Sequence, residues 1–206
     1  MPRTFSERHW AQTMNNRPAH QTLTISLLKK HSCFVFIGTV VIFPLIYQQF
    51  GFSLSFIKGC LLSTFLLYIS IIDWNYQLIF DRLLLPMLVI GLIFIYLQNE
   101  ASFLLAVCCA IAYAGLLLTL RFLTDGGLGG GDIKLAFVLG IWLNFPQTLW
   151  AALSAFWLGG FWGLTILLKG TAQRYIAFGP FLAIGALLAF LFGTDLYAIY
   201  RSLFYV

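Results

Sequence analysis

Two aspartates are the residues of this sequence best suited to chemistry. Asp73 follows the apolar run 66–72, and Asp132 follows the glycine-rich run 126–131. Two carboxylates that lie close together cannot both ionise easily, so the pair holds one proton between them. The ionised member can then take a proton from water as the water attacks a peptide carbonyl, while the protonated member stabilises the developing oxyanion. This is the chemistry of aspartyl proteolysis, and it requires that the two residues meet.

The composition places both aspartates in a membrane protein. Of the 206 residues, 61% are hydrophobic and 9% are charged, and the mean hydropathy is +0.91. A soluble domain carries roughly 25% charged residues, so this chain cannot cover a surface that faces water. We therefore expect lipid to be its main solvent and its fold to be an all-α, polytopic transmembrane helical bundle. Ionisable residues at membrane depth are candidates for a functional site.

Apolar segments long enough to cross a bilayer recur along the chain. A spanning helix needs about 20 apolar residues, and the candidates are 33–50, 53–72, 83–98, 101–123, 147–168 and 177–194. A seventh stretch, 133–143, is apolar but short, which fits a short crossing helix, a re-entrant segment or half of a broken helix. Asn144-Phe145-Pro146 should end it, because Pro disfavours helix at the preceding residue. Residues 1–32 predict a basic cytoplasmic tail, and 33–206 predict the transmembrane domain.

The basic residues decide the orientation. If the N-terminus lies inside and all seven segments cross, the cytoplasmic side receives ten of the twelve Lys and Arg residues, and only Lys58 and Arg201 lie elsewhere. The positive-inside rule therefore favours seven crossings with the N-terminus inside. The same topology puts Asp73 and Asp132 on the cytoplasmic side at similar depth. It also explains the net charge of +5 without a nucleic-acid partner, and none is expected.

Cysteine and histidine give no pattern for a metal. None of the four cysteines belongs to a C-x-x-C pair, and the three histidines all lie in the N-terminal segment. This spacing predicts neither a zinc site nor a disulfide framework. We expect no metal and no organic cofactor.

Plainer explanations exist for these features. An Asp at a helix start is usually a cap, which would account for Asp132, and Asp73 would be an ordinary interfacial residue pointing to water. The glycines let the backbone adopt positive φ and approach another chain closely. They would not cradle phosphate, because no Gly-Lys-Ser/Thr follows and a carboxylate opens the helix. A short, glycine-flanked helix with an aspartate at its end is also typical of transporters, so composition and topology leave an enzyme and an ion-coupled transporter or channel about equal.

Three blocks resemble the bacterial type IV prepilin peptidases, which are intramembrane aspartyl proteases of the GxGD type. Residues 129–134 (GGGDIK) resemble the Gly-x-Gly-Asp signature with its trailing Lys. Residues 72–81 resemble the family block in which an Asp is followed eight residues later by Pro-Asp, and residues 177–186 resemble the closing Pro-Phe-Gly-Pro segment. The blocks occur in the family's order and spacing over about residues 55–194.

The resemblance implies an aspartic endopeptidase with Asp73 and Asp132 as its catalytic pair. Its substrates would be type IV prepilins or pseudopilins, whose short basic leader is removed at the cytoplasmic face of the bacterial inner membrane. The residues implied to bind substrate or to support the loops are Asp81, Gly129, Gly130, Gly131, Lys134, Phe178, Gly179 and Pro180. Asp81 would tune the aspartate pair, bind the basic leader or pair with Arg82, and Lys134 would anchor the glycine loop or lipid head groups. Asp125 is a weaker candidate for attracting the leader.

This chain departs from the family pattern in three places. Many members carry a cytoplasmic domain with two C-x-x-C pairs between the first two helices, associated with N-methylation, whereas here only Gly51-Phe52 or so separate the first two segments. We therefore expect a peptidase without methyltransferase activity. Phe80 and Ala177 each stand where the family usually has Pro. A catalytically degenerate prepilin-binding homologue is a further alternative, and the sequence leaves open both the particular pilin and the oligomeric state.

Overall fold

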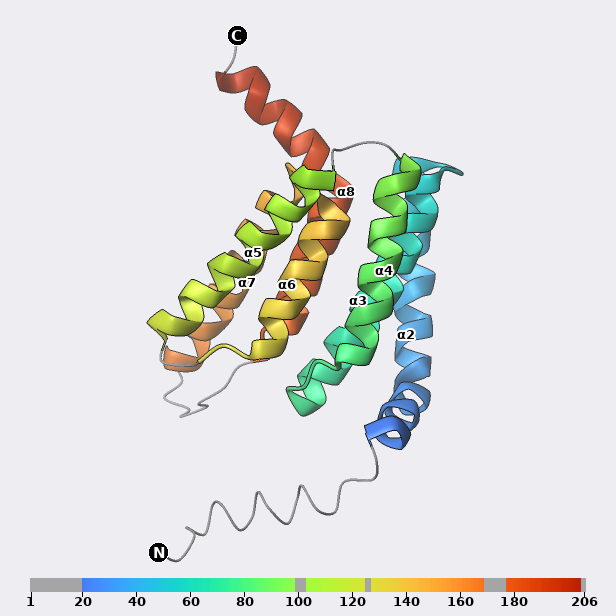
Figure 1. Ribbon diagram of the computed structural model, residues 1–206, viewed down its shortest axis with the longest axis vertical. Coiled ribbons are helices and arrows are strands. Elements are labelled where there is room, and N and C mark those ends of the chain that lie inside the picture. The colour runs from blue at the N-terminus through green and yellow to red at the C-terminus, as the bar shows by residue number, and fades with distance from the viewer. Residues whose placement is uncertain (1–19, 99–102, 125–126, 169–176, 205–206) are drawn as a thin grey trace, which may run out of the picture.

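The protein is a bundle of α-helices. The computed structural model describes residues 20–98, 103–124, 127–168 and 177–204, and all regular secondary structure in these ranges is helical. Figure 1 shows the helices as rods that run mostly along one direction. They are α2 (His20–Phe50), α3 (Leu54–Tyr76), α4 (Asp81–Gln98), α5 (Phe103–Leu123), α6 (Gly130–Leu143), α7 (Gln147–Leu168) and α8 (Gly179–Phe204). The prediction of an all-α protein is confirmed.

Several helix ends differ from the predicted ones, and the differences matter for the site. Helix α2 begins at His20, so it includes part of the segment 1–32 that was expected to be a tail. Helix α3 continues to Tyr76 and ends at Gln77, whose backbone is left-handed (φ 51°) and whose N–H donates to the Asp73 carbonyl at 2.8 Å. Asp73 therefore lies in the last turn of α3 instead of after it. Helix α8 extends to Phe204, ten residues beyond the predicted end at 194.

The short segment is helix α6, and it ends where the sequence predicted. Asn144 follows its last residue with a positive φ of 60°. The helix starts at Gly130, three residues earlier than predicted, so Asp132 lies in its first turn. Its 14 residues span about 21 Å, less than the roughly 30 Å of a bilayer's hydrocarbon core.

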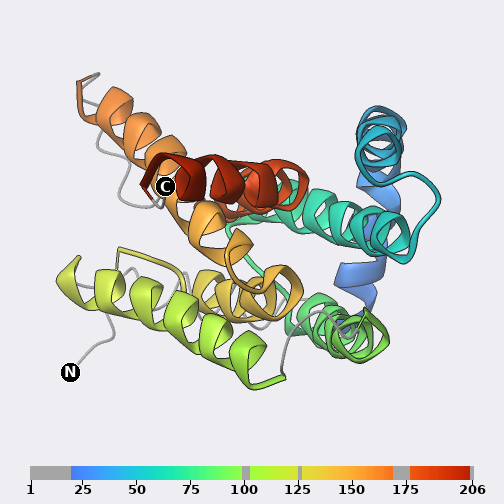
Figure 2. The same ribbon diagram turned by 90° about the horizontal axis from the view of Figure 1, so that it is seen from above.

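Helix α6 is the centre of the packing. It contacts α4, α5, α7 and α8, and Figure 2 shows it enclosed between neighbouring helices. Leu135, Leu139 and Trp142 on α6 are completely buried. The Trp142 indole N–H donates to the Met87 carbonyl of α4 at 2.8 Å. Gly91 of α4 leaves room for the ring, because a Cβ there would lie 2.6 Å from the indole nitrogen. Burial on nearly all sides allows so short and apolar a helix to stay in place.

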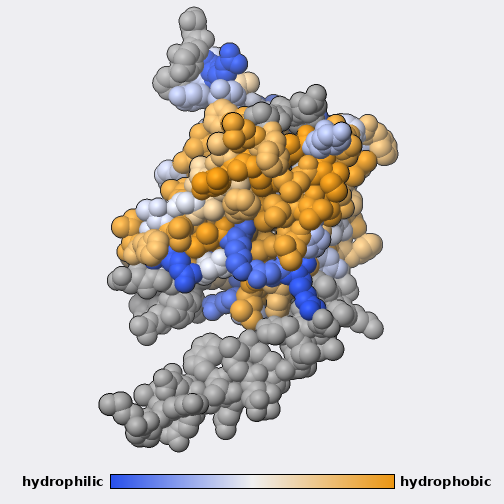
Figure 3. Space-filling model, viewed as in Figure 1, coloured by the Kyte–Doolittle hydropathy of each residue, from blue (hydrophilic) through white to orange (hydrophobic). Residues whose placement is uncertain are grey.

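The outer surface of the bundle is apolar. Large hydrophobic side chains such as Phe36, Leu85, Leu104 and Trp157 are more than half exposed. Figure 3 shows a broad hydrophobic band on one face of the molecule, with hydrophilic residues gathered near the lower end of the described helices. Within the described residues α3, α4, α5 and α8 are each long and apolar enough to cross a bilayer. The chain is a multi-pass membrane protein.

Three elements that are distant in sequence meet at one end of the bundle. The end of α3, the start of α6 and the start of α8 all lie at the lower end in Figure 1. Helix α8 packs against both α3 and α6. This end holds both Asp73 and Asp132, as the charge distribution predicted for their common side.

The contact between α5 and α6 depends on a glycine that has no room for a side chain. A Cβ on Gly140 would lie 2.4 Å from the Cα of Ala110, which is backbone and cannot move aside cheaply. We predict that Gly140→Ala lowers the free energy of unfolding by about 1–3 kcal/mol through overpacking. Thermal unfolding in detergent micelles measures the effect.

Gly115 provides the matched control, because a Cβ there meets nothing within 4 Å. Gly115→Ala should leave the midpoint temperature of thermal unfolding unchanged or raise it slightly, since Ala favours helix over Gly by up to about 1 kcal/mol. Equal midpoints for the two variants would contradict the proposed close packing of α5 and α6.

Candidate active site

Asp73 is buried and holds the start of another helix. Its side chain is 4% exposed. Its Oδ2 accepts a hydrogen bond of 2.9 Å from the backbone N–H of Gly179, the first residue of α8. The amide groups at a helix N-terminus lack partners within the helix, and the helix dipole favours a negative charge there. Asp73 of α3 therefore acts as a cap for α8, instead of pointing to water.

Only a glycine fits opposite this carboxylate. A Cβ on Gly179 would lie 2.6 Å from Asp73 Oδ2 and 2.9 Å from its Cγ. Phe178 and Pro180 flank this contact. Phe178 packs on α7 at Gly159, where an added Cβ would lie 2.5 Å from the ring, and Pro180 occupies the first turn of α8, where an N–H is not required. These three residues lie together at the start of α8, next to Asp73.

Asp132 is also buried and is only partly paired. It is 5% exposed. Its Oδ2 accepts a 3.2 Å hydrogen bond from the backbone N–H of Gly129, the residue before α6. Its Oδ1 is buried and has no hydrogen-bond partner in the described part of the chain. The capping role weighed from the sequence therefore accounts for one oxygen of Asp132, and the second oxygen is left for another group.

The two aspartates interact electrostatically. Asp132 lies in the first turn of α6, next to the glycine-rich loop. Helix α6 is not one of the four helices (α3, α4, α5 and α8) identified as long and apolar enough to cross the bilayer. Burial, and then the negative charge of Asp73, raise the pKa of Asp132 to about 7 against the opposing effect of the Gly129 hydrogen bond. Below about pH 7 the pair therefore holds one proton, which leaves as the pH rises through this value. Because such coupled groups titrate as a unit, the proton belongs to the pair.

The glycines before Asp132 serve close approach. The sequence suggested two uses for these glycines, a positive φ and a close approach to another chain segment. The first is wrong for the described glycines, because none of Gly127, Gly129, Gly130 and Gly131 has a positive φ. A Cβ on Gly131 would instead lie 2.8 Å from Cβ of Ile79, in the loop after α3. Cβ atoms on Gly129 and Gly130 would approach Asp132 Oδ2 to 2.9 Å and Arg121 Nη1 to 3.1 Å. Bulkier residues would push the first turn of α6 away from α3.

Asp81 and Lys134 pair with each other at the edge of the site. Lys134 Nζ donates to Oδ1 and Oδ2 of Asp81 at 2.8 and 2.9 Å. Asp81 therefore pairs with Lys134 of α6, and not with its neighbour Arg82 as one interpretation of the sequence had it. Both side chains are about 60% exposed, and such pairs contribute roughly 0–1 kcal/mol. The ion pair joins the first residue of α4 to α6 at Lys134, two residues after Asp132.

An aromatic cluster, which the sequence did not indicate, lies beside Asp73. Its rings are in contact at centroid distances of 6.0–6.3 Å and belong to Trp74, Phe156, Trp162, Phe178 and Phe181. Trp74 follows Asp73 directly, so it was visible as part of the block 72–81. Nothing in the spacing indicated that Trp162 of α7 would face it. The cluster joins α3, α7 and α8 around Asp73.

The family prolines that this chain lacks are not needed for the local structure. The carbonyl of Phe80 accepts hydrogen bonds from the backbone N–H groups of Leu83 and Leu84 at 3.0 and 3.4 Å. The first turn of α4 is therefore formed without a Pro at position 80. Ala177 lies just before α8 and is partly buried. Asp125 lies outside the described residues. Within the described ranges no three His, Cys, Asp or Glu side chains are grouped as a metal site would need.

Fold and site together define a multi-pass helical membrane protein with a buried, interacting aspartate pair. Residues 60–164 match the model of the type IV leader peptidase family, and the chain belongs to this family. It is 28% identical over 167 residues to a prepilin leader peptidase/N-methyltransferase of Bacillus subtilis, covering 79% of this chain and 66% of the relative. No solved structure matches it.

Two further relatives carry the same name. The one from Neisseria gonorrhoeae is 32% identical, with 74% of this chain and 54% of the relative covered. The one from Escherichia coli is 37% identical, with 60% and 58% covered. The chain thus spans about half to two thirds of the length of these curated relatives.

The Gly179 contact gives a direct test of the site's geometry. Gly179→Ala should force the Asp73 carboxylate away from the α8 amide and leave a buried charge without its hydrogen bond. We expect the free energy of unfolding to fall by about 1.5–3 kcal/mol, the cost of losing a hydrogen bond to a charged group. Thermal unfolding in detergent measures this change. Gly160→Ala, where a Cβ meets nothing within 4 Å, should leave the midpoint unchanged. A Gly179→Ala variant as stable as wild type would mean that Asp73 does not cap α8.

Proposed function

We propose that this protein is an intramembrane aspartyl endopeptidase that removes the basic leader from type IV prepilins or pseudopilins. The observation that carries the proposal is the pair of buried carboxylates, Asp73 and Asp132, which come from different helices and interact by charge at one end of the bundle. Membership of the leader peptidase family supports the substrate class. The names of the curated relatives describe the same reaction.

The pair has the groups that the chemistry requires. One carboxylate, ionised, takes a proton from the water that attacks the scissile carbonyl. The other, protonated, donates a hydrogen bond to the developing oxyanion. As the C–N bond breaks, the pair gives one proton to the departing amine, which balances the proton taken from water. The unpaired Oδ1 of Asp132 can hold the shared proton or contact the attacking water. The Gly179 hydrogen bond fixes Asp73 while this happens.

The proposed site of cleavage is the cytoplasmic face of the bacterial inner membrane. The positive-inside distribution favours an inside N-terminus and puts the loops beside Asp73 and Asp132 on the same side. Both aspartates lie within one turn of a helix end, Asp73 near the end of α3 and Asp132 at the third residue of α6. At this depth water can reach a substrate's peptide bond.

The same proposal includes cleavage without N-methylation. The connection between α2 and α3 is residues 51–53, so no domain is inserted there. A product with an unmodified N-terminus would agree with this.

The main rival function is an ion-coupled transporter or channel. Transporter carboxylates usually lie near the bilayer midplane at broken helices. The described helices have their buried aspartates at their ends, which favours the peptidase. A degenerate homologue that binds prepilins without cutting them differs from the proposal only in activity.

Replacing either aspartate should abolish cleavage without unfolding the protein. We expect Asp73→Asn and Asp132→Asn each to reduce processing of a tagged prepilin by at least about a hundredfold, because general acid–base catalysis contributes roughly that much or more. The prepilin is co-expressed in a peptidase-deficient bacterium and scored by gel shift and N-terminal sequencing.

Asp195→Asn is the matched control. Asp195 is an exposed aspartate on α8 that accepts a hydrogen bond from Gln49, and its variant should process normally. Retained cleavage by Asp73→Asn or Asp132→Asn would remove that residue from the catalytic pair. No cleavage by the well-inserted wild type of several prepilins would favour the degenerate homologue.

The cleavage rate should fall as the pH rises above about 7. Burial and Asp73 raise the pKa of Asp132 to about 7, and the reaction needs the pair to keep one proton. Above this pH the proton leaves, so the rate should drop by about tenfold for each pH unit. Initial rates in proteoliposomes give the profile, and Asp195→Asn should share it. A rate that continues to rise well above pH 7 would contradict proton sharing by this pair.

A further inference from the structure

A groove begins at the aspartate end of the bundle and runs along its outer surface. Its floor is α6, which packs against both α4 and α5, and its volume is about 490 Å³. The walls are apolar and include Leu84, Leu85 and Leu88 of α4, Ala114 of α5, and Phe137 and Val138 of α6. Small residues such as Ala114 allow another helix to come close in a membrane. The groove can thus receive a ridge of apolar side chains.

The head of this groove carries the exposed ion pair. Asp81 and Lys134 line it together with Ile133, and Ile133 directly follows Asp132. Asp81 is 62% exposed. Of the other carboxylates in the described ranges, Asp73 and Asp132 are buried, and Asp195 lies on the far half of α8. The groove therefore offers one accessible negative group close to the aspartate pair, followed by an apolar path.

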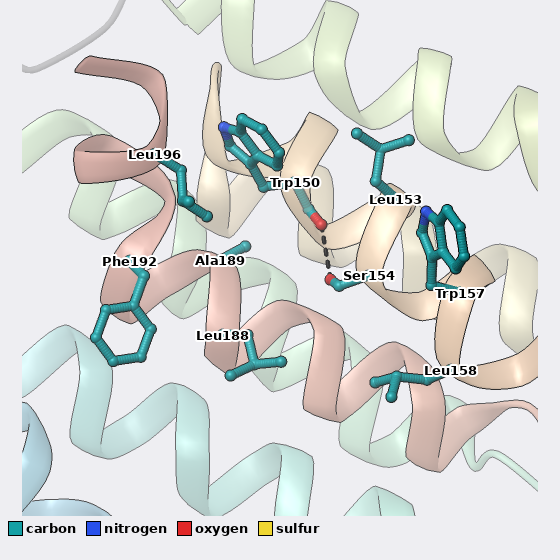
Figure 4. A pocket seen from close by; sticks show the side chains of 9 residues that line it. All are labelled: Trp150, Leu153, Ser154, Trp157, Leu158, Leu188, Ala189, Phe192 and Leu196. Atoms are coloured by element: carbon teal, nitrogen blue, oxygen red, sulfur yellow. Dashed lines mark hydrogen bonds between the residues drawn. The ribbon is translucent and has the colours of Figure 1, made fainter. Parts of the chain in front are cut away.

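A second apolar groove lies elsewhere and is a poorer candidate for a substrate. It has about 580 Å³ between α7 and α8, and Figure 4 shows Trp150 and Trp157 of α7 opposite Leu188 and Phe192 of α8. The dashed line in Figure 4 is a hydrogen bond within α7, which the Ser154 hydroxyl donates to the Trp150 carbonyl. The α8 residues that line it, 188–196, lie about 14–26 Å along the helix from Gly179. It has no charged residue among its lining.

We propose that the α4–α6–α5 groove binds the apolar helix of the uncleaved substrate, with Asp81 receiving a basic residue of the leader. This inference rests on the proposed function, under which the substrate is a basic leader followed by an apolar helix. That order of chemistry matches the groove, with a carboxylate at the head and apolar walls beyond it. Lys134 occupies Asp81 in the free protein, and a leader Lys or Arg replaces it on binding.

The exchange of partners is physically easy. Both members of the ion pair are largely solvated already, so releasing Lys134 leaves no buried charge without a partner. The apolar helix gains packing contacts in the groove, because association of helices within lipid is driven by close packing. The scissile bond, between leader and helix, is then positioned beside Ile133 and the aspartate pair.

Site-specific photocrosslinking tests the groove. Benzoylphenylalanine is introduced at Leu85 or Phe137 in the α4–α6–α5 groove, and at Leu188 or Phe192 in the α7–α8 groove, as matched Leu and Phe positions. The Asp73→Asn background keeps a tagged prepilin uncleaved. Crosslinks to the apolar helix of the prepilin are expected at 85 and 137 and not at 188 and 192. Crosslinks at 188 and 192 alone, equal crosslinks at all four positions, or lipid adducts without prepilin adducts would each overturn the proposal.

A kinetic measurement tests the head of the groove. Asp81→Asn should raise the KM for a prepilin with a basic leader several-fold and change kcat little, and the difference should vanish for a prepilin whose leader Lys and Arg are replaced by Gln. A merely structural ion pair would instead lower activity equally for both substrates, and Lys134→Gln, which also removes the pair, would then match Asp81→Asn. We expect Lys134→Gln to keep or lower the KM.

Wild-type cleavage of the same prepilin separates this proposal from the proposed function. If the wild type cleaves and no groove position crosslinks, the docking site is wrong and the peptidase stands. If the wild type does not cleave, the proposed function fails and the docking proposal fails with it.

Discussion

The hydrogen bond from the Gly179 amide to the buried Asp73 carboxylate joins the end of α3 to the start of α8. Without it, a charge at 4% exposure would have no compensation and the first turn of α8 would have unpaired amides. The same close approach leaves no room for a side chain at Gly179. The rings of Phe178 and Phe181 pack together next to it. One contact thus positions the aspartate and closes the bundle at this end.

Asp132 depends on a different kind of support. Its helix, α6, is too short to be held by lipid alone and is fixed by burial against its neighbours, with Gly140 against Ala110 on one side and Trp142 against Met87 on another. Glycines at its start let the first turn approach the loop after α3. The two aspartates therefore interact by charge because the end of α3 and the start of α6, each held by its own contacts, lie at the same end of the bundle. Their interaction, in a site shielded from water, is what leaves one proton on the pair.

The sequence predicted most of the helices and the common side of the two aspartates. Hydropathy predicted the helices, Asn144 and Pro146 predicted the end of α6, and the basic residues predicted that Asp73 and Asp132 share a side. The Asp81–Lys134 ion pair was not predictable, because its members are 53 residues apart and each has nearer partners in sequence. The capping of α8 by Asp73 and the contact of Trp74 with Trp162 could not be predicted from the sequence either. These features depend on how α3, α7 and α8 pack, and local patterns carry no such information.

The central claim is that Asp73 and Asp132 hold one proton between them in the folded protein. Infrared difference spectroscopy on the purified protein, taken below and above about pH 7, measures protonated carboxyl groups directly. One carboxylic acid band should disappear across this pH in wild type and in Asp195→Asn, and this change should be absent in Asp132→Asn. If wild type shows no protonated carboxyl below pH 7, or if the band persists in Asp132→Asn, the two aspartates do not form a proton-sharing pair.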